Sequence, residues 1–187
     1  MNKIVFDTET SGLPVRKGFD NYYDPSLTHC YDSSRLVQLG YIVLDKSDNV
    51  VKKYSSIIRP NKFKIENSEI HGITQAMAEN VGKNIVDVLE AFMTDVKECD
   101  TLVAHNMKFD YNILVSEMYR ADLKEMVREI GQKRLYCTML EAKRLYNLPK
   151  SPKLVELFGM LHGGRKWRQI HDAMDDAECC MMCYVKM

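Results

Sequence analysis

The sequence has no excess of charge of either sign: 26 Lys and Arg residues balance 26 Asp and Glu residues in 187 residues. This balance excludes the strongly basic proteins that coat nucleic acid by charge alone, but not a small site that gains positive charge from metal ions. Apolar residues make up 45% of the chain, which excludes a disordered or fibrous protein. The length suits a single domain over residues 1–187.

Long hydrophobic runs and a disulfide framework are also missing. Only six residues precede Asp7, and the longest apolar stretch, residues 36–44, is broken by polar and small residues. The segment before Asp7 is too short for the hydrophobic part of a signal peptide, and residues 36–44 are too few to span a bilayer. The six cysteines lack the spacing of a secreted domain, so we expect reduced thiols. These absences predict a soluble intracellular protein of the cytoplasm or nucleus, neither secreted nor bound to a membrane.

Hydrophobic periodicity predicts an α/β protein. We expect strands at residues 3–6, 36–44, 50–58 and 102–104, and helices at 84–98, from 107 onward, and near 121–130, 138–147, 152–161 and 173–186. Polar residues join the second and third strands as a hairpin, and the stretch around His71 is expected to be irregular. This order predicts a mixed β-sheet, an initial antiparallel meander plus parallel strands, flanked by helices on both faces.

Residues 15–34 are rich in turn formers, and we interpret them as a long loop insertion. Four aromatic residues lie in this loop: Phe19, Tyr22, Tyr23 and Tyr31. Such side chains can stack on single-stranded bases, but they more often fix a loop to its own domain, and we favour this second role.

Acidic residues follow the first strand and recur near two later helices. Asp7 and Glu9 project to the same face of an extended chain, so both can bind one cation. Asp110 lies just inside the helix after the buried strand, and residues 171–176 bring further acids to the start of the last helix. Oxygen ligands suit Mg²⁺ or Mn²⁺, whereas no Cys/His set has zinc spacing. Each acid alone could be a turn or capping residue, but together they would repel one another unless cations neutralise them.

Three motifs occur in a fixed order: residues 6–14 (Phe-Asp-Thr-Glu-Thr-Ser-Gly-Leu-Pro), 102–110 (Leu-Val-Ala-His-Asn-Met-Lys-Phe-Asp) and 171–177 (His-Asp-Ala-Met-Asp-Asp-Ala). Together they resemble the three motifs of the DEDDh 3′–5′ exonuclease superfamily, which contains the proofreading epsilon subunit of bacterial DNA polymerase III and ribonuclease T. The resemblance runs from residue 3 to about residue 180 and covers nearly the whole chain.

The resemblance implies a ribonuclease H-like fold and two divalent cations, Mg²⁺ with Mn²⁺ as a substitute, held by Asp7, Glu9, Asp110 and Asp176. In two-metal chemistry the ions lie about 4 Å apart and stabilise the attacking and leaving oxygens of a displacement at phosphorus. His171 would take a proton from the attacking water, a role that suits an unperturbed pKa of about 6.5. The product would be a nucleoside 5′-monophosphate released from the 3′ end.

The choice between Asp175 and Asp176 depends on where the last helix begins. Helix geometry alone pairs His171 with Asp175, four residues later. The spacing in the family is five residues and selects Asp176, which places His171 in the loop before the helix. Asp172 and Asp175 are then expected to be solvated or capping residues.

The resemblance also implies contacts with the terminal nucleotide, for which the alternative is ordinary turn, capping or packing chemistry. The implied residues are Thr10, Gly12, Leu13, His71, Asn106 and Phe109. Asn106 also suits the N-cap of the next helix, and His105 is expected to be a buried histidine with hydrogen-bond partners. Two basic stretches could contact phosphates: we interpret residues 52–64 as a solvated face and leave residues 165–168, beside His171, open between the two roles.

The leading hypothesis is a metal-dependent 3′–5′ exonuclease acting on single-stranded DNA or RNA ends, with DNA slightly preferred. An exoribonuclease that trims RNA 3′ ends is an alternative, because nothing in the sequence fixes a contact to the 2′-OH. A non-catalytic nucleic-acid-binding or partner-binding module on the same fold is a second alternative. A phosphatase that forms an aspartyl-phosphate is disfavoured, because the second acid of the Asp-x-Asp pattern is Glu9. A polymerase or replication protein is a candidate partner, and the oligomeric state stays open.

Overall fold

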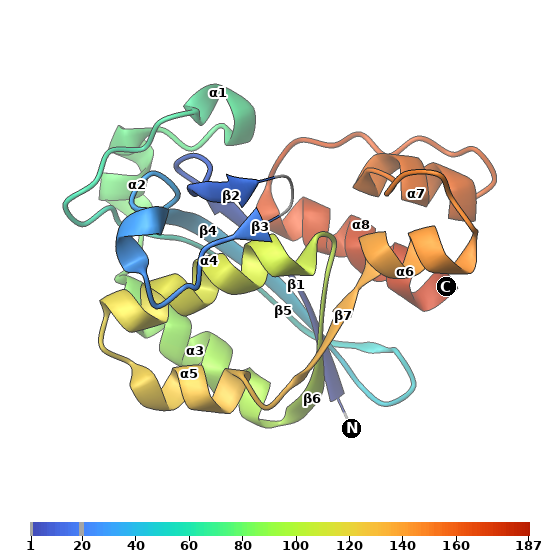
Figure 1. Ribbon diagram of the computed structural model, residues 1–187, viewed down its shortest axis with the longest axis horizontal. Coiled ribbons are helices and arrows are strands. Elements are labelled where there is room, and N and C mark those ends of the chain that lie inside the picture. Colours follow the sequence, from blue (N-terminus) through green and yellow to red (C-terminus); the bar gives the residue numbers. More distant parts are fainter. Residues whose placement is uncertain (1, 19–20) are drawn as a thin grey trace.

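The chain folds around a five-stranded mixed sheet, seen in the computed structural model, which describes residues 2–18 and 21–187 (Figure 1). The strands lie in the order β5-β4-β1-β6-β7, with the bounds β1 Asn2–Thr10, β4 Leu36–Leu44, β5 Val50–Ile57, β6 Cys99–Ala104 and β7 Arg134–Cys137. The pairs β1–β4 and β4–β5 are antiparallel, whereas β1, β6 and β7 run parallel to one another. The predicted antiparallel meander followed by parallel strands is therefore confirmed.

Helices cover both faces of this sheet (Figure 1). One face carries α3 Ile85–Lys97, α4 Met107–Arg120 and α5 Lys124–Ile130, and the other carries α6 Thr138–Leu145, α7 Leu154–Leu161 and α8 Ala173–Lys186. These six helices agree with the hydrophobic periodicity of the sequence. None of the helices in the described ranges has both the length and the apolar composition needed to cross a bilayer.

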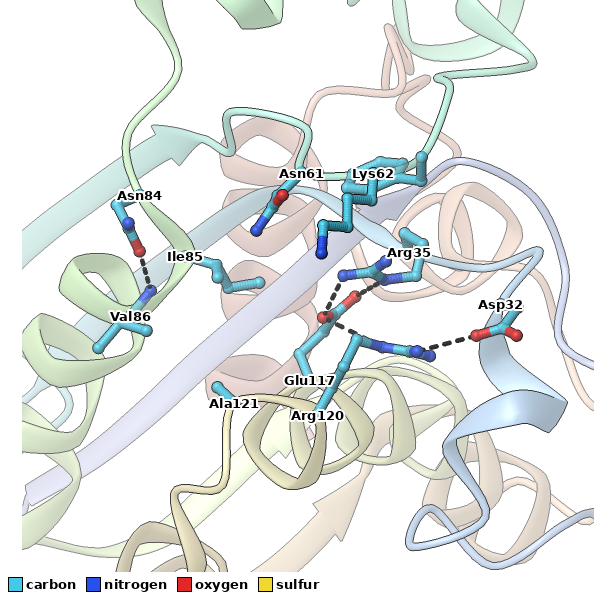
Figure 2. A pocket seen from close by; sticks show the side chains of 11 residues that line it. Asp32, Arg35, Asn61, Lys62, Asn84, Ile85, Val86, Glu117, Arg120 and Ala121 are labelled. Carbon is cyan, nitrogen blue, oxygen red and sulfur yellow. Dashed lines mark hydrogen bonds and ion pairs between the residues drawn. The ribbon is translucent and has the colours of Figure 1, made fainter.

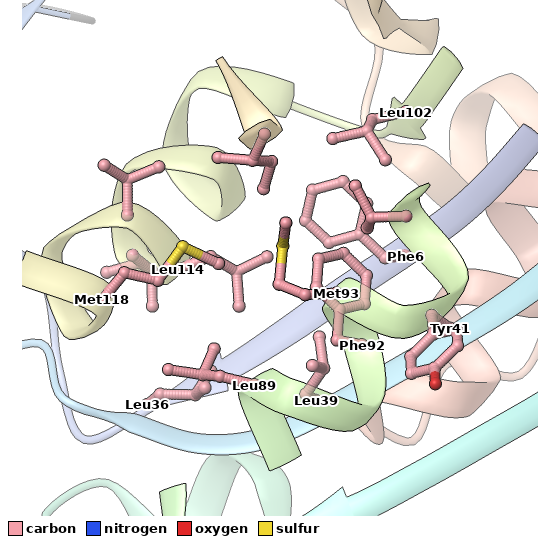
Figure 3. Close-up of a cluster of buried hydrophobic side chains, with 14 of the residues drawn as sticks. Phe6, Leu36, Leu39, Tyr41, Leu89, Phe92, Met93, Leu102, Leu114 and Met118 are labelled. Carbon is pink, nitrogen blue, oxygen red and sulfur yellow. The ribbon is translucent and has the colours of Figure 1, made fainter. Parts of the chain in front are cut away.

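Strand β4, between β5 and β1, separates two hydrophobic cores. All nine of its residues are buried, because helices cover the sheet on both sides. Leu39 and Tyr41 lie beside Phe92 of α3 in the first core, where the Tyr41 and Phe92 ring centroids are 5.2 Å apart (Figure 3). Ile42 and Leu44 belong to the second core, under α7 and α8. The alternation along β4 thus fixes which of its residues can face α8.

The segment predicted as a loop, residues 15–34, contains more regular structure than expected. It forms a two-stranded hairpin and a 3₁₀ helix: β2 Arg16–Gly18, β3 Asn21–Tyr22 and η1 Thr28–Tyr31. Buried tyrosines stabilise this regular structure. Tyr22 and Tyr31 are 6% and 0% exposed, and the Tyr31 hydroxyl donates a hydrogen bond to the carbonyl of Tyr23 at 2.5 Å. The three tyrosines therefore fix the segment to the domain, as we favoured. Phe19 lies outside the described residues.

Two further regions correct the prediction. The stretch around His71, expected to be irregular, forms the short helices α1 Ser68–His71 and α2 Gln75–Val81. Thr74 caps α2, because its Oγ1 accepts a hydrogen bond from the backbone nitrogen of Met77 at 3.2 Å. Strand β7 was not predicted, because it has only four residues and two of them are exposed at the sheet edge. Short elements of this kind lack the periodic pattern that identifies longer ones.

Candidate active site and metal centre

Strand β1 supplies two of the predicted ligands near its carboxyl end. Asp7 pairs with Gly40 of β4, and Glu9 pairs with Gln38. Residues directly opposite in an antiparallel pair share a face of the sheet. Because Gly40 and Gln38 both contact the start of α8, Asp7 and Glu9 project toward that helix as well.

Gly40 allows α8 to approach the sheet closely. A Cβ at this position would lie 2.5 Å from the carbonyl carbon of Ala173 and 2.5 Å from the backbone nitrogen of Met174. Any larger residue would push the helix away, so glycine lets the first turn of α8 pack directly on β4. Asp176 belongs to this first turn and reaches the carboxyl end of β1. This role was not predicted, because a glycine inside an apolar strand gives no sign in the sequence of the helix that packs on it.

Gln38 fixes the beginning of α8. Its side chain is buried; Nε2 donates to Oδ2 of Asp172 at 2.7 Å, and Oε1 accepts from the backbone nitrogen of Ala173 at 3.1 Å. Asp172 in turn caps the helix, since its Oδ1 accepts from the backbone nitrogens of Met174 and Asp175. The capping role expected for Asp172 is thus confirmed. Gln38 was missed, although a lone polar residue inside an apolar strand is the signal that could have found it.

Helix α4 brings Asp110 to the same strand end. Asp110 is 3% exposed, and its Oδ1 accepts two hydrogen bonds from Thr8, at 3.1 Å from the backbone nitrogen and 2.7 Å from Oγ1. Thr8 lies between Asp7 and Glu9 in the sequence. The second motif is therefore tied directly to the first, across a separation of 102 residues.

Glu9, His171 and Asp176 converge on one point. One ligand atom from each of these residues lies within 4.8 Å of the others. His171 is exposed, precedes the N-cap of α8 and has a φ of 51°, so it lies outside the helix. Asp175 points elsewhere and accepts a hydrogen bond from Nε1 of Trp167 at 2.8 Å. This geometry favours Asp176 over Asp175, as the five-residue spacing did.

Burial, together with neighbouring negative charges, raises the pKa of all four predicted ligands. Burial first, and then the charges of Asp110, Asp176 and Glu9, raise the pKa of Asp7 well above its usual value. Burial, followed by the charges of Asp176 and Asp110, raises the pKa of Glu9 from 4.5 to about 8. Burial raises the pKa of Asp110 to about 7 and also raises that of Asp176. Negative charge gathered here is costly unless protons or cations compensate it.

This donor set fits divalent cations of the Mg²⁺ or Mn²⁺ type. Carboxylate oxygens predominate, and hard cations prefer such ligands. Among the described residues, none of the four acids forms an ion pair with a Lys or Arg side chain. Gln169 instead donates from Nε2 to both carboxylate oxygens of Asp176, at 3.0 and 2.9 Å. Gln169, like Gly40 and Gln38, is a site residue that was not predicted from the sequence.

A cavity of about 390 Å³ opens beside the carboxylates and is lined by Asp7 and Asp176, among others. His105 also lines it, and both of its ring nitrogens have partners: Nδ1 lies 3.0 Å from Oγ1 of Thr138, and Nε2 lies 3.1 Å from the carbonyl oxygen of Pro152. Burial lowers the pKa of His105 to about 4, so this ring stays neutral near pH 7. The expectation of a histidine with satisfied hydrogen bonds is confirmed.

Of the two predicted contact residues Asn106 and Phe109, Asn106 lines this cavity and Phe109 does not. Asn106 lines it, but its side chain does not cap α4, because the residue adopts a left-handed φ of 70° and makes no capping hydrogen bond. The expected N-cap interaction is therefore wrong, although α4 does begin at the next residue. Phe109 is half-buried and packs on Tyr22, with ring centroids 6.2 Å apart.

The other predicted nucleotide contacts surround the end of β1. Thr10 donates from Oγ1 to the carbonyl of Gly12 at 2.7 Å, which is the turn chemistry of the alternative interpretation. Leu13 is 63% exposed and has apolar surface to offer a ligand. His71 is buried, and burial, together with the charge of His171, lowers its pKa. The structure thus places His71 close enough to His171 to interact with it electrostatically.

A larger cavity, of about 680 Å³, lies between β4, the segment before α1 and the ends of α3 and α4 (Figure 2). Glu117 is 2% exposed and accepts hydrogen bonds from Nε and NH2 of Arg35 at 2.6 and 3.0 Å. Arg120 lies between Glu117 and Asp32 and pairs with Asp32 at 2.8 Å. These charges neutralise one another. We interpret them as a network that holds the ends of β4, η1 and α4 together, away from the carboxylate cluster.

A family model of exonucleases (RNase_T) matches residues 4–184. The chain belongs to the exonuclease family. This membership confirms the resemblance to the DEDDh exonuclease superfamily that the three motifs indicated.

Curated relatives of the exonuclease chain are DNA polymerase III proteins of bacteria. It is 28% identical over 184 residues to the PolC-type DNA polymerase III of Thermotoga maritima, covering 98% of this chain and 12% of the polymerase. It is 26% identical over 195 residues to the DNA polymerase III epsilon subunit of Rickettsia conorii, covering 100% of this chain and 74% of that subunit.

Solved structures of exonuclease I share the fold of the exonuclease chain. The complex of E. coli exonuclease I with a dA16 oligonucleotide has a TM-score of 0.73 at 17% identity, over 97% of this chain and 39% of exonuclease I. A further exonuclease I structure has a TM-score of 0.75 at 18% identity, with the same coverage. This likeness confirms the predicted ribonuclease H-like fold.

Proposed function

We propose that residues 1–187 form a single domain that acts as a divalent-metal-dependent 3′–5′ exonuclease and releases nucleoside 5′-monophosphates. The observation that carries the proposal is the convergence of Glu9, His171 and Asp176 within 4.8 Å, beside Asp7 and Asp110, in a member of the exonuclease family. Their raised pKa values support a site designed for cations, because ordinary structural acids are paired or exposed.

Asp7, Glu9, Asp110 and Asp176 would hold the cations, Mg²⁺ with Mn²⁺ as a substitute. Bound divalent ions would polarise the scissile phosphate and stabilise the charge that develops on its oxygens. The chain contributes rigidity: Thr8 orients Asp110, Gln38 fixes the start of α8, and Gly40 lets α8 pack closely on β4. Oriented ligands of this kind need no rearrangement during the reaction.

His171 is proposed to take the proton from the attacking water. Its exposure keeps the imidazole accessible, and its proximity to Glu9 and Asp176 places it at the cation site. An imidazole nitrogen can accept a proton from water and return it to solvent. The left-handed backbone at His171 directs the side chain from the loop toward Glu9.

Single-stranded DNA is the proposed substrate, and a replicative polymerase is the proposed type of partner. The relatives named DNA polymerase III epsilon and the exonuclease I structure solved with a dA16 oligonucleotide support this choice. Trimming of RNA 3′ ends is an outcome that the same test distinguishes. Contacts from Thr10, Leu13 and Phe109 to the terminal nucleotide are part of the proposal, since these residues surround the end of β1 and the start of α4.

The test compares digestion of end-labelled single-stranded DNA, single-stranded RNA and duplex DNA with Mg²⁺, Mn²⁺ or a chelator. We expect metal-dependent release of mononucleotides from the 3′ end, fastest on single-stranded DNA. Asp176→Asn should abolish release, whereas Asp175→Asn, one residue away, should retain most of it because its oxygen can still accept from Trp167. Equal losses in the two variants, or no release from any wild-type digest, would contradict the proposal.

A further inference from the structure

Strand β2 presents two exposed cations, Arg16 and Lys17. All three residues of β2 are exposed, and within the described part of the chain neither Arg16 nor Lys17 forms an ion pair. Aromatic rings hold both side chains instead: the guanidinium of Arg16 lies 5.3 Å from the centroid of Tyr22, and the ammonium of Lys17 lies 4.9 Å from that of Tyr23. Such contacts orient a cation and leave its outer side available to a ligand.

The hairpin is anchored to the helix that supplies Asp110. Tyr22 is 6% exposed and packs on Phe109, the residue before Asp110, with ring centroids 6.2 Å apart. The backbone nitrogen of Val15, just before the hairpin, donates to the carbonyl of Cys30 at 2.9 Å. Arg16 is therefore linked to the proposed ligand Asp110 through two aromatic rings, those of Tyr22 and Phe109. Tyr22 is buried and Phe109 is half-buried.

A second cationic segment lies at the same end of the sheet, before α8 (Figure 1). Arg165, Lys166 and Arg168 are exposed, and none of them forms an ion pair among the residues that the structure describes. Trp167 anchors this segment through its hydrogen bond to Asp175 and its packing on Phe158, with ring centroids 5.1 Å apart. Each cationic segment is thus attached by an aromatic residue to a helix that carries a proposed ligand.

Lys52 and Lys53, in the basic stretch 52–64, already have acidic partners: they pair with Asp95 and Glu178 at 2.6 and 2.8 Å. A phosphate contact to either lysine would have to replace an existing ion pair. Arg16 and Lys17 form no ion pair within the described residues, so a phosphate can contact them without breaking one. Each phosphate that they neutralise releases counterions condensed on the nucleic acid.

We propose that the β2–β3 hairpin is a nucleic-acid-binding element, in which Arg16 and Lys17 contact backbone phosphates of the single strand whose 3′ end enters the carboxylate site. The inference rests on the proposed function, because the strand must reach that site. The segment 165–168 forms the opposite side of the same path. The contacts are made to phosphates, so they hold the strand without selecting its sequence.

The experiment measures binding separately from turnover. Fluorescence anisotropy of a labelled single-stranded oligonucleotide of about 12 nucleotides, in a chelator, gives the dissociation constant at several salt concentrations. Each phosphate contact to a single strand contributes about 0.7 to the slope of log affinity against log salt, so Arg16→Ala/Lys17→Ala should lower that slope by about 1.4. Lys46→Ala/Lys97→Ala removes two exposed cations at the opposite end of the sheet and should keep the wild-type slope.

A charge-conserving variant separates binding from folding. Arg16→Lys/Lys17→Arg should restore the slope if phosphates are bound, whereas damage to the hairpin would not be repaired. The inference is overturned if the alanine variant keeps the wild-type slope or if the control pair lowers it equally. Turnover is measured separately in Mg²⁺. If the wild type digests DNA but the alanine variant keeps the wild-type salt slope, the hairpin does not bind phosphates and the proposed exonuclease function still stands. If the alanine variant lowers the slope but the wild type digests nothing, the hairpin binds phosphates and the proposed exonuclease function is wrong.

Discussion

Replacing Glu9 by glutamine should stabilise the metal-free protein at alkaline pH while destroying the cation site. The change keeps the shape of the side chain and removes its charge. Ionised Glu9 is unfavourable in the folded state, because burial and then the charges of Asp176 and Asp110 raise its pKa from 4.5 to about 8. The folded protein therefore binds more protons than the unfolded chain between these pH values. The stability contributed by Glu9 is complete below about pH 4.5 and is lost as the pH rises to about 8.

The size of the effect follows from the shift. At 1.36 kcal/mol per pKa unit, a shift from 4.5 to about 8 corresponds to at most about 5 kcal/mol. Glu9 keeps some contact with water, which screens the repulsion, so we expect a gain of about 2 kcal/mol for Glu9→Gln at pH 9. At pH 5 the folded wild type already carries a protonated Glu9, and the variant should gain less than about 1 kcal/mol.

Urea unfolding in a chelator at pH 5 and pH 9 measures both values. Glu90→Gln removes one exposed carboxylate of α3 and serves as the control, with no pH-dependent gain expected. If Glu9→Gln is less stable than wild type at pH 9, or gains equally at both pH values, the electrostatic account of the site is wrong. Added Mn²⁺ should stabilise the wild type and leave Glu9→Gln almost unaffected, because ligand binding stabilises only the state that binds.

Three further variants test a structural ion-pair network, a support of the site and the proposed base. Glu117→Ala should lower the free energy of unfolding by about 3 kcal/mol in chemical denaturation, because it leaves the half-buried Arg35 without its partner, yet the surviving folded protein should digest DNA normally. Gln38→Leu should weaken Mn²⁺ binding about 10-fold to 100-fold in a calorimetric titration, since it frees Asp172 and the start of α8. His171→Gln should slow digestion by about 100-fold or more at saturating Mn²⁺ while Mn²⁺ still binds, and equal losses of binding and turnover would contradict its role as a base.

The sequence predicted the parts of the fold that have long, periodic patterns. Strand β4 was predicted with its observed bounds, because a continuous apolar run that is buried on both faces needs no other signal. Helix α8 was also predicted with its observed bounds. The acidic residues of its first turn were interpreted first as candidate metal ligands. The hairpin β2–β3 and the helices α1 and α2 were missed, since these elements are short and depend on distant contacts such as Tyr22 on Phe109.

The acidic residues of the candidate site were predicted from the sequence, but the residues that hold them in position were not. Asp7, Glu9 and Asp176 stand out because their spacing follows a family pattern. Gln38 and Gly40 carry no such pattern, because their function is to hold a helix that lies more than 130 residues away in the sequence. Contacts of this range depend on how β4 meets α8, which only the folded chain determines.

The most direct test of the account is a calorimetric titration of the metal-free protein with Mn²⁺ near pH 7.5, repeated in buffers of different ionisation enthalpy. The account predicts binding of about two ions per chain with release of protons, because Glu9 and Asp110 have pKa values of about 8 and 7 without metal. Asp7→Asn and Asp176→Asn should lose this binding. Absence of Mn²⁺ binding to the wild type, or binding that survives in both variants without proton release, would contradict the claim that these carboxylates form one cation site.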